Sequence, residues 1–132
     1  MERQLFSGWA YITRAEDVPG CWVAHCYEFD IVSTGDSPAH AVDMIREAVA
    51  LCIADDLNRG LDPHARRAPE DAWAPLLRLF ERHTKVPVSA LNGSPFREFA
   101  VPIAVMLQRV NHALEADGAA DVHDAALVDA AA

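Results

Sequence analysis

The sequence predicts an α+β protein: an antiparallel sheet of three to four strands, with a long helix packed on one face and a second, shorter helix. Three observations predict this class. Short runs of β-branched and aromatic residues open the chain, a long stretch with helical spacing follows a Ser-Pro pair, and an alternating apolar run comes late. With 132 residues, the chain is long enough for one domain with one core.

Three strand-like runs precede the long helix. Leu5 to Thr13 supplies the first, and a polar turn ending in Pro-Gly follows it. Cys21 to Tyr27 and Ile31 to Thr34 supply the second and third, separated by a kink at Glu28 to Asp30. Because the connections are short, we expect a three-stranded antiparallel meander.

A long amphipathic helix is expected from Pro38 to about Asn58. Ser37 is suited to cap this helix, and Pro38 suits its first turn, where the missing N–H would have had no partner. Gly60 stands where a left-handed C-terminal cap is needed. Apolar residues recur at helical spacing along the stretch: Ala41, Val42, Ile45, Ala48, Val49, Cys52, Ile53 and Leu57.

The second half of the chain contains a shorter helix and a late strand. Residues 62–72 are typical of a loop, and a helix is expected from about Trp73 to His83, with Pro75 in its first turn. Residues 85–88 form either a short edge strand or an extended loop. Arg97 to Gln108 alternates with period two, and Pro102 within it indicates an edge position or a bulge.

Residues 1–108 are therefore expected to form a single α+β domain with a C-terminal extension. Residues 109–116 have the composition of a short helix. From residue 117 onward the chain is rich in Ala and Asp, with few large apolar groups, so we expect a disordered tail to residue 132.

Composition favours some partners over others. The formal net charge is −9, which disfavours direct binding of nucleic acid and suits a basic partner protein, although the same charge also serves solubility. Neither a signal peptide nor an apolar run long enough to span a membrane is visible, so we expect a cytoplasmic protein. In the reducing cytosol, free thiols are the simplest interpretation of the three cysteines.

Candidate catalytic and metal-binding groups do not converge in the sequence pattern. His25 and Cys26 are adjacent in a strand, so they point to opposite faces and cannot easily share a metal. Cys21 and His25 share a face but stand roughly 13 Å apart by the rise of a strand. We therefore expect no catalytic residue, no cofactor and no metal.

Both faces of the second predicted strand carry apolar groups. Trp22, Ala24 and Cys26 share one face, and Cys21, Val23 and Tyr27 share the other. Burial on both faces would follow from a dimer or a partner complex, or equally from coverage by the second helix.

Three short stretches carry a resemblance to a known family. Gly20 to Ala24, Gly35 to Ser37, and Ala41 with Arg46 to Ala48 resemble the N-terminal domain of HicB-type antitoxins. The resemblance covers roughly residues 5–62. The chain departs from the family pattern in three respects. The family often has Pro where this chain has Tyr27, and a carboxylate where it has His40. The family also has a DNA-binding C-terminal segment, which is not recognisable in this chain.

The resemblance implies a HicB-like, partial RNase H-like fold and a non-enzymatic, antitoxin-like function. The implied partner is a small basic RNA-cleaving toxin of the HicA type, and we also expect a homo-oligomer, a dimer or higher. One alternative is a stand-alone homo-oligomeric domain. Another is a remnant nuclease that uses Asp36, Glu28 or Asp30 with magnesium. The residues expected to bind a partner are Trp9, Trp22, Tyr27, Glu28 and Asp30.

Overall fold

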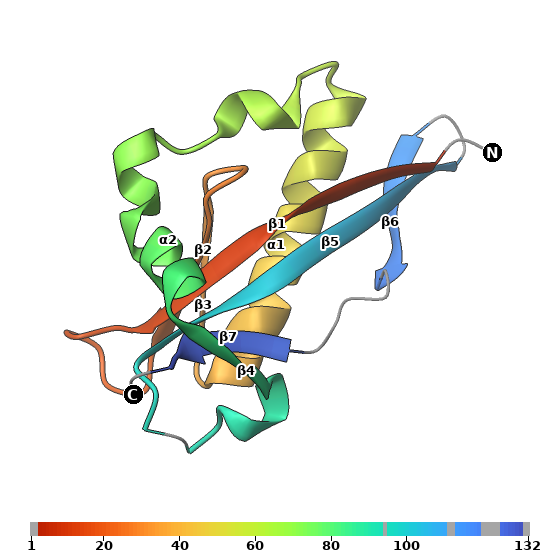
Figure 1. Ribbon diagram of the computed structural model, residues 1–132. Coiled ribbons are helices and arrows are strands. Elements are labelled where there is room, and N and C mark those ends of the chain that lie inside the picture. Colours follow the sequence, from red (N-terminus) through yellow and green to blue (C-terminus); the bar gives the residue numbers. More distant parts are fainter. Residues whose placement is uncertain (1–2, 94, 111–112, 120–124, 131–132) are drawn as a thin grey trace.

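The computed structural model describes residues 3–93, 95–110, 113–119 and 125–130. Seven strands among these residues form one antiparallel sheet (Figure 1): β1 (Arg3–Arg14), β2 (Trp22–Cys26), β3 (Ile31–Gly35), β4 (His83–Pro87), β5 (Glu98–Val110), β6 (Ala113–Ala119) and β7 (Ala125–Asp129). The strand order is β3-β2-β1-β5-β7-β4, and β6 pairs with β5. The α+β class is confirmed, but the expectation of three to four strands is too low.

The N-terminal meander is confirmed. β1 pairs with β2, and β2 pairs with β3, so that Ala10 lies opposite Cys26 and Cys26 lies opposite Ile31. Gly20 has a φ of +73° in the connection between β1 and β2, a backbone conformation that glycine adopts without steric cost.

Helix α1 (Pro38–Asn58) has the bounds expected from the sequence, and it covers one face of the sheet. The Ser37 Oγ accepts the N–H of His40 at 3.1 Å, and Gly60 has a φ of +72° just beyond the helix end. The apolar stripe of α1 packs with the side chains that the sheet turns toward it: Val42, Ile45, Val49 and Ile53 against Ile12, Phe99, Val101 and Ile103. We call this side of the sheet the α1 face.

Shorter helices cover the opposite side, which we call the α2 face. Residues 62–72, expected as a loop, contain the 3₁₀ helices η1 (Pro63–Arg66) and η2 (Glu70–Trp73), and α2 (Ala74–Glu81) follows with Pro75 in its first turn. η2 and α2 cover a second core cluster on this face: Tyr11, Tyr27, Ala68, Trp73, Leu76, Leu79, Ala100 and Leu127. η1 instead lies against the α1-face cluster, with the His64 ring 5.5 Å from that of Phe6. On the second predicted strand, Tyr27 is buried against Trp73 of η2, while Cys21 and Val23 on the same face are only half-buried and lie outside this cluster.

The C-terminal part differs from the sequence-based expectation. Residues 109–110 belong to β5 and residues 113–116 to β6, so the short helix is wrong there. Residues 117–119 and 125–129 are also strands, so the expected disordered tail is wrong for them, while residues 120–124 and 131–132 lie outside the described part. β7 pairs with both β4 and β5, and this pairing buries Ala126, Leu127 and Val128. β4 is an edge strand, followed by the 3₁₀ helix η3 (Val88–Ala90).

β5 is a central strand, so the edge position expected from Pro102 is wrong; the other alternative, a bulge, occurs in β5 only farther along, between Val105 and Leu107. Pro102 stands opposite Trp9 on β1. On the other side of β5, β7 pairs at Ala100 and β6 pairs from Val105 onward. Among the described strands, none pairs with Pro102 on that side, so none requires an N–H from it.

Candidate docking surface

The register between β1 and β5 determines which side chains face α2. Tyr11 lies opposite Ala100, and both lie in the cluster beneath α2. Because side chains alternate along a strand, the next positions on this face are Trp9 opposite Pro102, Ser7 opposite Ala104, and Leu5 opposite Met106. These positions continue the α2 face toward the N-terminal end of β1.

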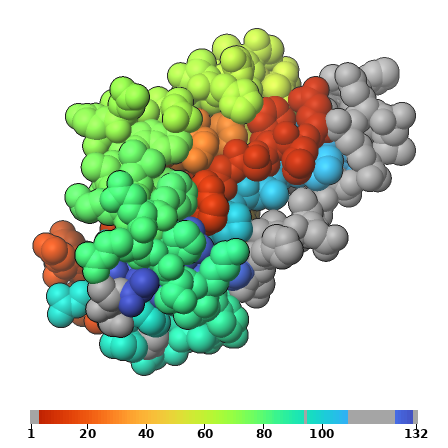
Figure 2. Space-filling view, in the orientation of Figure 1, coloured from red at the N-terminus to blue at the C-terminus, as the bar shows by residue number. Residues whose placement is uncertain are grey.

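This continuation is an uncovered apolar surface, which we call the apolar strip: Leu5, Trp9, Pro102, Ala104 and Met106. Leu5 is 60% exposed, and the other four are half-buried. Figure 2 shows the atoms of β1 and β5 open at the surface beside α2. Phe80 on α2 borders the strip, with its ring 5.0 Å from that of Trp9 in an edge-to-face arrangement.

Two of the expected partner-binding residues lie in the core, on opposite faces of the sheet. Trp22 is buried on the α1 face against Phe99, with the Arg14 guanidinium 5.0 Å from its ring centre. Tyr27 is buried on the α2 face, where its ring lies 5.7 Å from that of Trp73. Both aromatic rings are therefore occupied by contacts within the chain.

Trp9 and Glu28 are brought together. Oε2 of Glu28 accepts the backbone N–H of Trp9 at 2.7 Å, and a Cβ on Gly8 would collide with the same carboxylate. Among the described residues, Glu28 forms no ion pair. Glu28 therefore places a negative charge at the β2-side edge of β1, toward the α1 face.

Asp30 lies apart from Glu28, in the turn between β2 and β3. Its φ is +50°, an uncommon conformation that Asp tolerates better than most residues. Oδ1 of Asp30 lies 2.7 Å from Nε2 of His25, whose ring stands 4.3 Å from that of Tyr27. This contact ties the turn to β2.

The thiol nearest to a carboxylate is unsuited to nucleophilic chemistry. Cys26 is buried, and its Sγ lies 3.7 Å from Oε2 of Glu28. Burial raises the pKa of Cys26 to about 12, and the Glu28 carboxylate adds to that rise. The thiol is thus protonated at neutral pH, and thiolate is the reactive form.

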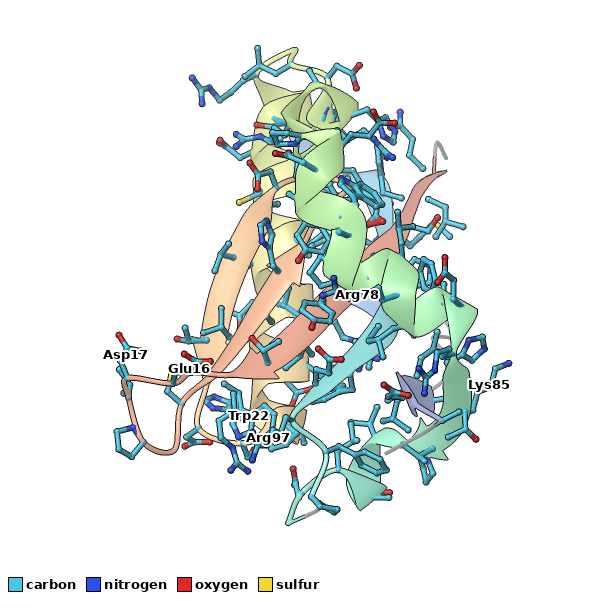
Figure 3. The ribbon with its side chains drawn as sticks, turned by 60° about the vertical axis from the view of Figure 1, so that its left-hand side comes forward. Glu16, Asp17, Trp22, Arg78, Lys85 and Arg97 are labelled. Atoms are coloured by element: carbon cyan, nitrogen blue, oxygen red, sulfur yellow. The ribbon has the colours of Figure 1, made fainter. Side chains whose placement is uncertain are left out.

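A second feature is a charged groove at one end of the sheet. Three hollows of about 480, 430 and 280 Å³ follow one another there: Arg97 lines the first and the second, and Glu98 and Asp129 line the second and the third. Tyr11 donates its hydroxyl hydrogen to Glu98, and Figure 3 shows Arg97 near Trp22 at this end and Arg78 on α2. Charges of both signs line the hollows: Arg14, Arg78, Arg82 and Arg97 with Glu16, Glu81, Glu98 and Asp129. This mixture gives the groove no preference for either sign of charge.

The described residues hold no group of three or more His, Cys, Asp or Glu side chains that could bind a metal ion. In the same part of the chain, neither helix combines the length and the apolar character needed to cross a membrane. Comparison with protein-family models, curated proteins and solved structures finds no match to this chain. The resemblance of residues 5–62 to the HicB-type domain therefore stays an expectation.

The sequence alone missed most of the apolar strip. Trp9 was expected at a partner-binding surface, but Leu5, Pro102, Ala104 and Met106 were not. The alternation of β1 and β5 was visible in the sequence. The sequence predicted a short second helix, but it showed neither the pairing of β1 with β5 nor the part of the sheet that this helix would cover.

Proposed function

We propose that this chain is a non-enzymatic protein-binding module whose apolar strip binds a small basic protein. The observation that carries the proposal is the position of the strip on one face of two paired strands, unbroken along β5 and interrupted along β1 only by Ser7. A single exposed Leu would need no explanation, whereas a contiguous apolar row on a sheet face is typical of an interaction surface. Trp9 supplies the kind of aromatic anchor that dominates binding energy at such surfaces.

The charge of the chain favours a basic partner. A net charge of −9 attracts a cationic protein at long range and speeds its encounter. Glu28, at the β2-side edge of β1, offers a local carboxylate to a Lys or Arg of the partner. The same net charge opposes the association of two copies. A homo-oligomer formed through the strip is the alternative to a basic partner.

The finer proposal is an antitoxin-like role, with a HicA-type RNA-cleaving toxin as the partner. Its support is the resemblance of residues 5–62 to the HicB-type domain. The meander followed by one long helix agrees with the fold that this resemblance implies. A cytoplasmic location belongs to the same proposal, because a toxin that cleaves cellular RNA has to be neutralised there.

The test is co-expression with a small basic protein encoded in the adjacent reading frame. The wild-type chain is expected to co-purify with this protein and to bind it more weakly as salt is raised. A double variant, Leu5→Ser with Met106→Ser, should lose at least tenfold in affinity. The matched control is Leu51→Ser on α1, where a leucine of similar exposure, 63%, lies outside the strip; it should stay within twofold.

Two results would count against the proposal. If the wild-type chain binds no basic protein encoded beside it, the proposed partner is wrong. If the strip variant and the Leu51→Ser control lose equal affinity, the apolar strip is not the binding site. Light scattering of the isolated chain tests the alternative that the strip binds a second copy of the chain. In that case the wild type should be a dimer and the double variant a monomer.

A further inference from the structure

β1 is paired along only part of the edge that faces β2. The β1–β2 register runs from Arg14 opposite Trp22 to Ala10 opposite Cys26, and there it stops. β1 itself continues to Arg3, and on its other edge it stays paired with β5 as far as Gln108. Among the described strands, none lies beside residues 3–9 on the β2 side.

Two hydrogen bonds fix the direction of the backbone groups along β1. The N–H of Ala15 donates to the carbonyl of Cys21, on the β2 side, at 2.9 Å, and the N–H of Arg14 donates to the carbonyl of Arg97, on the β5 side, at 3.3 Å. Since these directions alternate along a strand, the N–H and C=O groups of Leu5, Ser7 and Trp9 point to the β2 side. The Trp9 N–H bond to Glu28 agrees with this assignment.

Leu5 and Ser7 therefore present unpaired backbone groups at an open edge. No hydrogen bond to the N–H of either residue is found in the part of the chain that the structure describes, and both residues are exposed. The same two residues lie on the α2 face, so the open edge adjoins the apolar strip. Hydrogen-bonding groups beside an apolar face are what an added β-strand uses for affinity and for specificity.

From this juxtaposition, we infer that the partner binds by adding an extended segment to β1 along Leu5 and Ser7. Alternate side chains of that segment would lie beside Leu5 and Trp9 on the α2 face, and a basic residue would meet Glu28 where the open edge ends. This inference rests on the proposed function, and it names the recognition mode that the partner uses. A second copy of this chain fits less well, because pairing two copies would bring together two chains of charge −9.

The strands at the two ends of the order β3-β2-β1-β5-β7-β4 differ from this open edge. β4 carries Lys85 and Pro87, residues that discourage strand addition. β3 has only five residues, and Thr34, opposite Val23, points its backbone away from β2 into solvent. Thr34 thus has the same kind of outward N–H as Ser7, but far from the strip, which makes it a matched control.

The test compares three single variants in binding to the basic protein of the adjacent reading frame. Ser7→Pro removes the outward N–H and places a ring at the open edge, while the ladder between β1 and β5 is kept. It should weaken binding at least tenfold. Ser7→Ala, which keeps the N–H, and Thr34→Pro, which removes an outward N–H elsewhere, should both stay within twofold of wild type.

Amide hydrogen exchange on the wild-type chain provides a readout that does not depend on any variant folding. The Leu5 and Ser7 amides should exchange rapidly in the free protein and at least tenfold more slowly in the complex. If the wild-type chain binds but Ser7→Pro binds equally well and these amides stay unprotected, strand addition is wrong and the protein-binding function survives. If the wild-type chain binds no basic protein at all, both the strand-addition mode and the proposed protein-binding function are wrong.

Discussion

The two faces of the sheet are covered in different ways. On the α1 face, a single helix of 21 residues runs along the strands, and the large side chains beneath it are fully buried. On the α2 face, a helix of eight residues and the short 3₁₀ helix η2 cover the middle and leave the end near Leu5 open (Figure 1). The length of the covering helix thus decides how much apolar surface each face keeps in contact with solvent.

This difference separates stability from binding. Removal of apolar surface from water is the main favourable term in folding, so most of the free energy of folding should come from the α1 face. The open end of the α2 face contributes less to folding and keeps apolar area for a partner. Matched substitutions on the two faces should therefore differ in their effects on stability and on binding.

The largest effect is expected from truncating one phenylalanine on each face. Phe99 is fully buried on the α1 face, so Phe99→Ala should lower the free energy of unfolding by about 3–5 kcal/mol. Phe80 is half-buried beside the strip, and its removal should cost about 1–2 kcal/mol, including its ring contact with Trp9. Urea unfolding measures both losses. Equal losses would show that the two faces contribute alike.

A glycine at the junction of β3 and α1 should give the next largest effect. A Cβ on Gly35 would lie only 2.6 Å from the Cα of Ala41, so the strand end and the helix start would have to separate. Gly35→Ala should lower the free energy of unfolding by about 2–3 kcal/mol. The control is Gly20→Ala, where a Cβ meets no atom within 4 Å and only the positive φ costs about 1 kcal/mol. Thermal unfolding distinguishes the two, and a smaller loss at Gly35 would contradict the tight packing of the α1 face.

Sequence reasoning was most accurate where the signal is local. The bounds of α1 follow from Ser37, Pro38 and an uninterrupted helical spacing, all of which act within a few residues. β6 and β7 were missed because their stability comes from pairing with distant strands. The Ala-Ala-Leu-Val run of β7 has little strand propensity of its own, and it is held between β4 and β5.

The candidate site shows the same limit. Trp9 and Glu28 attract notice as single residues, and the structure places them side by side. Leu5 and Met106 are 101 positions apart in the chain, and they become neighbours only because β1 pairs with β5. No local sequence pattern encodes the register of this pairing. The open edge at Ser7 depends further on β2 ending at Cys26, which composition does not reveal.

The ion pair that joins α1 to η1 should have an intermediate effect that depends on pH. Asp56, in the last turn of α1, is 1% exposed, and both of its oxygens accept hydrogen bonds from Arg66 on η1, at 2.6 and 2.8 Å. Hydrogen bonds from Arg66 hold the pKa of Asp56 below its usual value, against the opposing effect of burial. Arg66→Met should lower the free energy of unfolding by about 1–3 kcal/mol at pH 7, because a buried carboxylate loses its partner.

The sign of the pH dependence follows from the lowered pKa. The ion pair contributes fully above the unfolded-state pKa of Asp, about 3.9, and the contribution is lost as the pH falls through the lower folded-state value. The gap between wild type and Arg66→Met should therefore narrow below pH 4, as measured by urea midpoints at pH 7 and pH 3. Arg59→Met, at the exposed pair with Asp55, should cost within about 0.5 kcal/mol. A gap of the same size at both pH values would rule out the ion pair as the cause.

The smallest effect on stability is expected at the apolar strip itself. Because Leu5 is mostly exposed, Leu5→Ser should change the free energy of unfolding by no more than about 0.5 kcal/mol. The same substitution should lower the binding of a hydrophobic dye to the folded protein, whereas Leu51→Ser on α1 should leave dye binding closer to wild type, because Leu51 lies outside the strip. A loss above 1 kcal/mol for Leu5→Ser would mean that this end of the α2 face contributes to folding, and the division between a stabilising face and a binding face would no longer hold.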